Sequence, residues 1–167
     1  MTNIRRYFKK GNIYFLTHVT YNRIPILVQN IDLLWQAFQS MKNDFPFEMI
    51  GWVMLPDHFH IIIDPREDNL SNLMRRIKLS FSGNFRKRAG LTCGRVWQYR
   101  FWNHIIRDGE DMNRHIDYIH YNSVKHGLVK SPFEYPHSSI HKYFSEGYYD
   151  KDWGIKDDPT RGENYGE

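Results

Sequence analysis

The sequence has very little cysteine and no long hydrophobic run. Cys93 is the only cysteine among 167 residues, which excludes an internal disulfide and a cysteine-rich zinc site. No stretch reaches the roughly 18 consecutive apolar residues of a membrane helix, and the N-terminal segment MTNIRRYFKKGN lacks the apolar core of a signal peptide. We therefore expect a cytoplasmic protein without membrane association. The length suits one domain of ordinary size and leaves no room for a second.

Charged residues are distributed unevenly along the chain. Residues 146–167 hold seven acidic and three basic side chains, whereas the whole chain has a net charge of +4, so residues 1–145 carry +8. The last segment is also rich in Gly, Asp and Asn and has little apolar periodicity. We expect one basic domain over residues 1–145, followed by an acidic, loosely ordered tail over residues 146–167. Such a tail either solubilises the protein or lies over a basic groove and competes with a polyanionic ligand.

Hydrophobic periodicity predicts an α+β fold. Aromatic and β-branched segments favour strands, and apolar residues at helical spacing favour helices between them. Pro56-Asp57 is a turn dipeptide between two adjacent predicted strands, which indicates an antiparallel hairpin. This order matches a ferredoxin-like split βαβ sandwich, with an antiparallel sheet and helices on one face. The predicted strands are 12–22, 47–55, 58–63 and 100–108, and the predicted helices are 31–45, 69–88 and 110–127.

Two histidines one residue apart begin the third predicted strand, in the segment LPDHFHIII. Residues at i and i+2 of a strand point to the same side, with Cα atoms about 7 Å apart. His58 and His60 can therefore reach one cation, on the face opposite Ile61 and Ile63. The alternative is a pair of strand histidines that are only solvated or hydrogen-bonded.

The last predicted helix carries two adjacent stripes. Met112, Ile116, Ile119 and Ser123 follow helical spacing and predict the buried stripe. Asp111, His115, Tyr118 and Asn122 form the neighbouring stripe, in which Tyr118 and Asn122 are one turn apart. This spacing places a phenol beside an amide oxygen that is able to bind a metal. Packing of Tyr118 at a core edge, with Asn122 capping the helix end, explains the same pattern without a function.

Basic and aromatic residues supply a candidate surface for DNA. Basic side chains can neutralise phosphates, although a charged helix face is by default only solvated. Aromatic side chains interleaved with arginine can stack unpaired bases, and they are also common in protein cores. The candidate DNA-binding residues are Arg75, Arg76, Lys78, Arg86, Lys87 and Arg88 in the second predicted helix, and Tyr99 and Arg100 in the segment VWQYRFW.

Four motifs in order, VMLPDHFHIII, RFWNHIIR, DYIHYNSVKHGLV and YPHSS, resemble the single-tyrosine HUH transposases, in particular the REP-associated tyrosine transposases of bacteria. The resemblance covers most of residues 5–145. It implies that His58, His60 and Asn122 bind one divalent metal and that Tyr118 is the nucleophile. It also implies the ferredoxin-like fold. Ser123 departs from the proline that usually follows the asparagine in this family, and without proline the helix is free to continue.

The implied reaction is cleavage and rejoining of hairpin or single-stranded DNA through a covalent 5′-phosphotyrosine. A tyrosine with a pKa near 10 is a poor nucleophile toward an anionic phosphodiester, so charge neutralisation by a metal is needed. Phosphate chemistry favours Mg or Mn, and three evident protein ligands do not favour a structural zinc site. Because insertion-sequence relatives are typically dimers and REP-associated ones can be self-contained, we expect a monomer and keep the homodimer as the alternative.

Three other functions fit parts of the pattern. A non-catalytic single-stranded nucleic-acid-binding module uses the same fold and stacks bases on an open sheet. A replication initiator or relaxase would usually bring further domains, for which 167 residues leave no room. A metal hydrolase would use a water nucleophile, with Tyr118 only orienting that water. Trapping of a covalent protein–DNA adduct separates these functions from the transposase.

Overall fold

The computed structural model describes residues 11–66 and 69–167. The first ten residues of the predicted 1–145 domain therefore lie outside the described residues. Secondary-structure elements follow in the predicted order of strand, helix, two strands, helix, strand and helix. The strands and α-helices are β1 (Tyr14–Val19), α1 (Ile31–Met41), β2 (Glu48–Met54), β3 (His58–Asp64), α2 (Leu70–Ala89), β4 (Trp102–Ile105), α3 (Gly109–Lys125) and α4 (Ile140–Ser145). Short 3-10 turns lie at Tyr21–Arg23, Val28–Asn30 and Pro132–Glu134.

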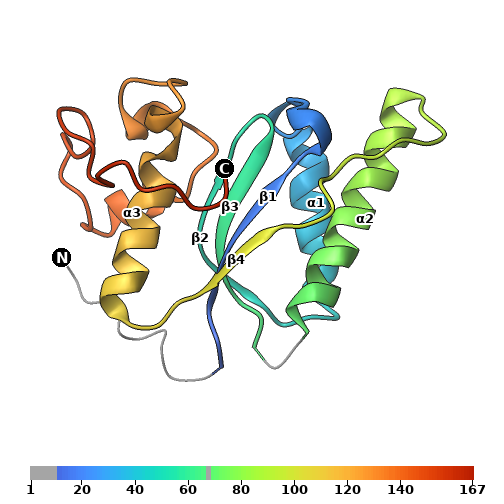
Figure 1. The fold of residues 1–167 in the computed structure, drawn as a ribbon, viewed down its shortest axis with the longest axis horizontal. Coiled ribbons are helices and arrows are strands. Elements are labelled where there is room, and N and C mark those ends of the chain that lie inside the picture. The colour runs from blue at the N-terminus through green and yellow to red at the C-terminus, as the bar shows by residue number, and fades with distance from the viewer. Residues whose placement is uncertain (1–10, 67–68) are drawn as a thin grey trace.

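The four strands form one antiparallel sheet in the order β2-β3-β1-β4. This order places the two strands of the predicted hairpin side by side and β1 in the middle (Figure 1). The α+β, ferredoxin-like class is confirmed. Several elements are shorter than predicted. Strand β1 ends at Val19 because Asn22 and Arg23 adopt positive φ in the next turn. Helix α1 ends at Met41, four residues earlier than predicted.

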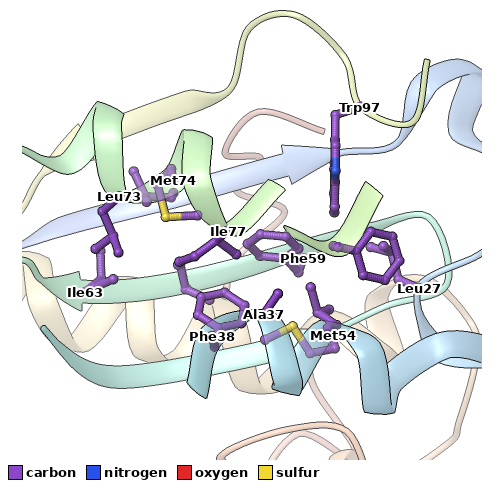
Figure 2. Close-up of a cluster of buried hydrophobic side chains, with 14 of the residues drawn as sticks. Leu27, Ala37, Phe38, Met54, Phe59, Ile63, Leu73, Met74, Ile77 and Trp97 are labelled. Carbon is purple, nitrogen blue, oxygen red and sulfur yellow. The ribbon is translucent and has the colours of Figure 1, made fainter. Parts of the chain in front are cut away.

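Helices α1 and α2 cover one face of the sheet and bury the first core with it. Alternate residues of β3, Phe59, Ile61 and Ile63, point into this core, as the two-residue period of a strand requires. Figure 2 shows Phe59 between Ile77 of α2 and side chains that include Leu27 and Trp97. The prediction that the isoleucines and the histidines of β3 face opposite sides is therefore correct.

Helix α3 packs on the opposite face, which corrects the expectation that helices cover one face alone. Ile116 and Ile119 of α3 meet Phe15 and Ile62, the strand residues that point away from the first core. Gly51 permits this approach, because a Cβ atom there would lie 2.6 Å from Cδ1 of Ile116. In Figure 1 the sheet accordingly lies between α3 and the α1–α2 pair. The face that was expected to be open is thus half covered by a helix.

The C-terminal segment crosses this second face. Tyr148 and Tyr165 pack against the core that α3 forms with the sheet. In Figure 1 the segment runs past α3 and ends near β3. Of the helices in the described part of the chain, none has the length and apolar character needed to cross a membrane.

Candidate active site

His58 and His60 lie buried on the face of the sheet that carries α3. Nδ1 of His58 lies 2.6 Å from Oδ1 of Asp57, and Nδ1 of His60 lies 2.8 Å from Oγ1 of Thr17. The Thr17 hydroxyl donates to the carbonyl oxygen of Tyr165, so His60 Nδ1 must donate to Thr17. Both rings therefore hold their Nδ1 in a hydrogen bond and turn Nε2 away from it. This is the arrangement that fixes imidazoles as metal ligands.

The environment of His60 keeps its imidazole neutral. Burial lowers the pKa of His60 to about 4, although the hydrogen bond to Glu167 opposes that shift. Burial alone would raise the pKa of Asp57, but the hydrogen bonds from His58 and Arg23 lower it to about 2. At neutral pH the pair therefore combines a neutral His60 with an ionised carboxylate that orients His58. Neutral imidazole is the form that binds metal ions.

Tyr118 and Asn122 face the histidines from α3. The rings of His60 and Tyr118 are 5.3 Å apart and meet edge to face. Both predicted stripes of α3 are buried, including Met112, Ile119 and Ser123 of the first. The helix continues through Ser123 to Lys125, as the absence of proline allows. The prediction from helical spacing that Tyr118 and Asn122 lie together is therefore correct. The structure adds that both face the histidine pair.

The side chain of the C-terminal residue, Glu167, occupies the space between these groups. Its Oε1 accepts hydrogen bonds from the Tyr118 hydroxyl and from Asn122 Nδ2 at 2.7 Å, and it lies 3.1 Å from His60 Nε2. Its Oε2 lies 3.2 Å from Lys125 Nζ and 3.1 Å from His126 Nε2. Burial alone would raise the pKa of Glu167, but these hydrogen bonds outweigh it and hold the pKa far below its usual range. An anion is thus bound at the centre of the predicted site.

The hydroxyl of Tyr118 is closed to solvent in this arrangement. Tyr118 is 0% exposed, and burial together with its bond to Glu167 raises the pKa of the phenol well above 10. Lys125 Nζ donates to the same hydroxyl at 3.1 Å and lies 4.6 Å from the ring centroid. A nucleophile in this state is protonated and inaccessible, so the C-terminal segment has to leave before Tyr118 can react.

Lys125, Thr17 and Glu167 complete the site and were not predicted. Lys125 could have been predicted from the sequence, because it follows Tyr118 by two helical turns and so lies on the same face of the helix. Thr17 lies on β1 opposite His60, and only the pairing of the strands reveals that contact. Glu167 lies 107 residues from His60 in the sequence, so its place could not come from local spacing. The acidic character of the tail was the one available signal.

Most of the predicted DNA-binding residues lie away from this site. Helix α2 is on the other face of the sheet, so its basic side chains do not meet the histidines. Arg76 pairs with Asp44 and Arg88 pairs with Asp32. Lys78 lies over the ring of Phe101, and burial lowers its pKa. The others of this helix are Arg75, which donates to Asn72, Arg86, which donates to the carbonyl of Gly94, and Lys87.

Tyr99 and Arg100 are exposed in the connection between α2 and β4. Tyr99 is 84% exposed, and the guanidinium of Arg95 lies 3.8 Å from the centroid of its ring. Arg95 also lies over Tyr21, and the backbone of Tyr21 is joined to the same connection by a hydrogen bond from its N–H to Val96. By contrast, Trp97 of the same segment is part of the first core. The segment VWQYRFW thus divides between core packing and an exposed aromatic and basic surface.

Comparison with known proteins identifies the family. Residues 9–122 match the family described as "Transposase IS200 like". A REP-associated tyrosine transposase of Escherichia coli (strain K12) is 37% identical over 158 residues, which are 92% of this chain and 91% of that protein. A protein of Haemophilus influenzae, provisionally given the same name, is 35% identical over 165 residues, 92% of this chain and 94% of its own.

A solved structure of a REP-associated tyrosine transposase bound to a REP hairpin superposes with a TM-score of 0.79 and 37% identity. That similarity extends over 100% of this chain and 98% of the solved one. These matches agree with the four motifs and with the sheet order. The chain therefore belongs to the IS200-like transposases, enzymes that cleave and rejoin DNA, and within them to the REP-associated tyrosine transposases.

Proposed function

We propose that this transposase acts on REP-like hairpin DNA through a covalent bond between Tyr118 and the DNA. The oxygen of Tyr118 attacks the phosphorus, the P–O3′ bond breaks, and the strand remains attached through its 5′ phosphate. The phenol gives up its proton to water, and the departing 3′ oxygen takes one up. In the reverse direction, a 3′ hydroxyl attacks the phosphotyrosine and a joined strand results. Because each phosphotyrosine replaces one phosphodiester, rejoining needs no external energy source.

One observation carries this proposal. The Tyr118 hydroxyl, the Asn122 amide and His60 Nε2 all contact the same carboxylate oxygen of Glu167. A phosphate oxygen is also an anionic acceptor, and it can replace the carboxylate beside the two donors, Tyr118 and Asn122. The nucleophile and the groups that would bind the phosphate are therefore already assembled around one point.

The residues present also fit a divalent metal. Nε2 of His58 and Oδ1 of Asn122 are buried and have no hydrogen-bond partner among the described residues. Both are metal-ligand atoms, and buried polar atoms are rarely left unpaired without a reason. His58, His60 and Asn122 would hold Mg or Mn, which would polarise the phosphate and neutralise the charge that develops on it. The carboxylate of Glu167 meets the same histidines and offers a further possible ligand.

Lys125 supplies a fixed positive charge beside the nucleophile. Its ammonium group remains within reach of the Tyr118 hydroxyl when Glu167 departs, because both side chains belong to α3. A cation at that distance stabilises the phenolate and lowers the pKa that burial raises. We therefore assign Lys125 to activation of Tyr118. Its replacement by methionine should lower the rate of adduct formation and shift its pH optimum upward, whereas arginine should retain most of the rate.

Recognition of the hairpin by this chain is inferred from its relatives. The solved transposase that resembles it over its whole length is bound to a REP hairpin. Tyr99 and Arg95 offer an exposed stacking surface for such a ligand, and the basic residues of α2 remain candidates for contacts with its phosphates. We keep the monomer as the proposed state of the protein and the homodimer as the alternative.

An adduct assay tests the proposal. The full chain and its Glu167→Gln variant are incubated with labelled hairpin DNA and Mn²⁺ and then separated on a denaturing gel. We expect a slower covalent band that requires Tyr118, His58 and the metal. Tyr121→Phe, a change to another tyrosine of α3, should leave the band unchanged.

Two outcomes contradict the proposal. DNA binding without an adduct in any variant indicates a binding module that lacks the chemistry. Cleavage that persists in Tyr118→Phe indicates a water nucleophile instead. Either result leaves the fold and family membership in place, because those rest on the structure and the comparisons alone.

A further inference from the structure

The ring of Tyr165 fills a pocket of aromatic side chains directly beside the nucleophile. It stacks on His115 with ring centroids 4.3 Å apart and an interplanar angle of 25°. It meets Tyr118 edge to face at 4.7 Å, and Phe15 and Trp102 lie at 5.6 and 5.7 Å. We call the four residues Phe15, Trp102, His115 and Tyr118 the aromatic pocket.

The walls of the aromatic pocket belong to the sheet and α3, and only its occupant belongs to the C-terminal segment. Trp102 stacks on His104 with an angle of 12°, and His104 stacks on His115 with an angle of 11°. Asp111 holds the two histidines in place. Its carboxylate accepts a hydrogen bond from His104 Nε2 at 2.8 Å, and its backbone carbonyl accepts one from His115 Nδ1 at 2.8 Å. The pocket is therefore held in shape by contacts that do not depend on Tyr165.

The occupant has to leave when DNA binds. Glu167 caps the hydroxyl of Tyr118, so no phosphate can reach that oxygen until Glu167 departs. Tyr165 is two residues away and is tied to the same site, since its N–H donates to the Tyr118 hydroxyl at 3.2 Å and its carbonyl accepts from Thr17. Displacement of the carboxylate thus vacates the aromatic pocket, which would then expose apolar rings to water.

We propose that the aromatic pocket binds one nucleobase of the DNA strand, next to the phosphate that Tyr118 attacks. The inference rests on the proposed function and adds a base-binding site to it. Glu167 and Tyr165 together place an anion and an aromatic ring side by side, as a nucleotide places its phosphate and its base. Stacking on aromatic side chains is the usual way in which unpaired bases are held.

The test measures hairpin binding by fluorescence anisotropy, in the full chain with Tyr165→Ala so that the pocket is vacant. In that background Trp102→Ala should weaken binding about tenfold, the effect of losing one stacked base, whereas Trp102→Phe should retain most of the affinity. Phe144→Ala, at an aromatic residue of α4 that is also partly exposed, should have no effect. Thermal melting of each variant confirms that it is folded.

Abasic substitution of the DNA identifies the base. One abasic position next to the cleaved phosphate should cost the same factor, and Trp102→Ala should then cost nothing more, because both changes remove one contact. Equal binding of all abasic hairpins, or additive losses, would overturn the base site even if Tyr118 forms its adduct. Loss of the adduct with base-dependent binding intact would instead overturn the proposed chemistry and leave the base site standing.

Discussion

Replacement of Glu167 by glutamine should increase the affinity of the protein for hairpin DNA. The amide is nearly isosteric, and its oxygen can still accept from Tyr118 and Asn122. Its NH₂ group, however, faces Lys125 and His126, which are donors 3.2 and 3.1 Å from Oε2. The substitution therefore removes two charge-assisted contacts and leaves donors facing each other, while the rest of the C-terminal segment is unchanged.

The size of the effect follows from these contacts. A hydrogen bond to a charged group contributes about 1.5–3 kcal/mol. Lys125 and His126 are partly exposed, so water replaces part of the lost hydrogen bonding. We therefore assign about 2 kcal/mol of docking free energy to the two contacts together. A segment that covers the site lowers apparent DNA affinity by the fraction of molecules in which the site is open. Weaker docking by about 2 kcal/mol should thus tighten binding by up to about 30-fold.

Fluorescence anisotropy with a labelled hairpin at fixed salt measures this change. The matched control is Asp157→Asn, which removes the same charge from an exposed position of the same segment. If the segment competes with DNA only through its net charge, the two variants should behave alike. An equal gain in both, or no gain in Glu167→Gln, would refute the view that Glu167 occupies the phosphate position.

Three further predictions concern stability and the metal. Burial raises the pKa of Asp117 to about 6. Its stabilising contribution is complete below its unfolded pKa near 4 and is lost as the pH rises through about 6, so Asp117→Asn should raise Tm at pH 8 and leave it unchanged at pH 4. Gly51→Ala should destabilise the fold by about 1–3 kcal/mol in urea titrations through overpacking, whereas Gly83→Ala, in an open helical position, should stabilise it by about 0.5–1 kcal/mol. Asp57→Asn should weaken Mn²⁺ binding about 10- to 100-fold, because His58 loses the carboxylate that orients it; unchanged binding would argue against that role.

Local periodicity was sufficient to predict the order of elements and the two residue pairs of the site, whereas only the family resemblance implied that the two pairs meet. The two-residue period of β3 fixed which side His58 and His60 face, and the helical period of α3 fixed that Tyr118 and Asn122 lie together. Both relations depend only on backbone geometry within one element. They hold whatever the tertiary structure turns out to be, so one sequence is enough to establish them.

The position of α3 could not be predicted in the same way. The stripe of Asp111, His115, Tyr118 and Asn122 is polar enough to suggest solvent, yet all four residues are buried. Hydrogen bonds inside the fold permit this, since Tyr118 and Asn122 both donate to Glu167, which is 49 and 45 residues away in the sequence. Burial of polar groups depends on partners that are distant in sequence, and a periodic pattern carries no information about them.

The basic residues of α2 show the limit of charge as a guide to function. Arg76 and Arg88 each pair with an acidic side chain and lie on the face opposite Tyr118. Exposed ion pairs contribute little to stability, so these arginines remain able to exchange their partners for phosphates.

The C-terminal segment covers the site and also contributes to the stability of the fold. A cut after residue 145, where the acidic composition begins, would remove Glu167 and also Tyr149, whose hydroxyl bridges Asp117 and His120. Tyr148 packs on the second core as well. Such a truncation would therefore mix a gain in DNA access with a loss of stability, whereas removal of Gly166 and Glu167 keeps the core contacts of Tyr165 in place. A higher DNA affinity after this short cut, at an unchanged Tm, would assign competition with DNA to the last two residues and anchoring of the segment to its earlier part.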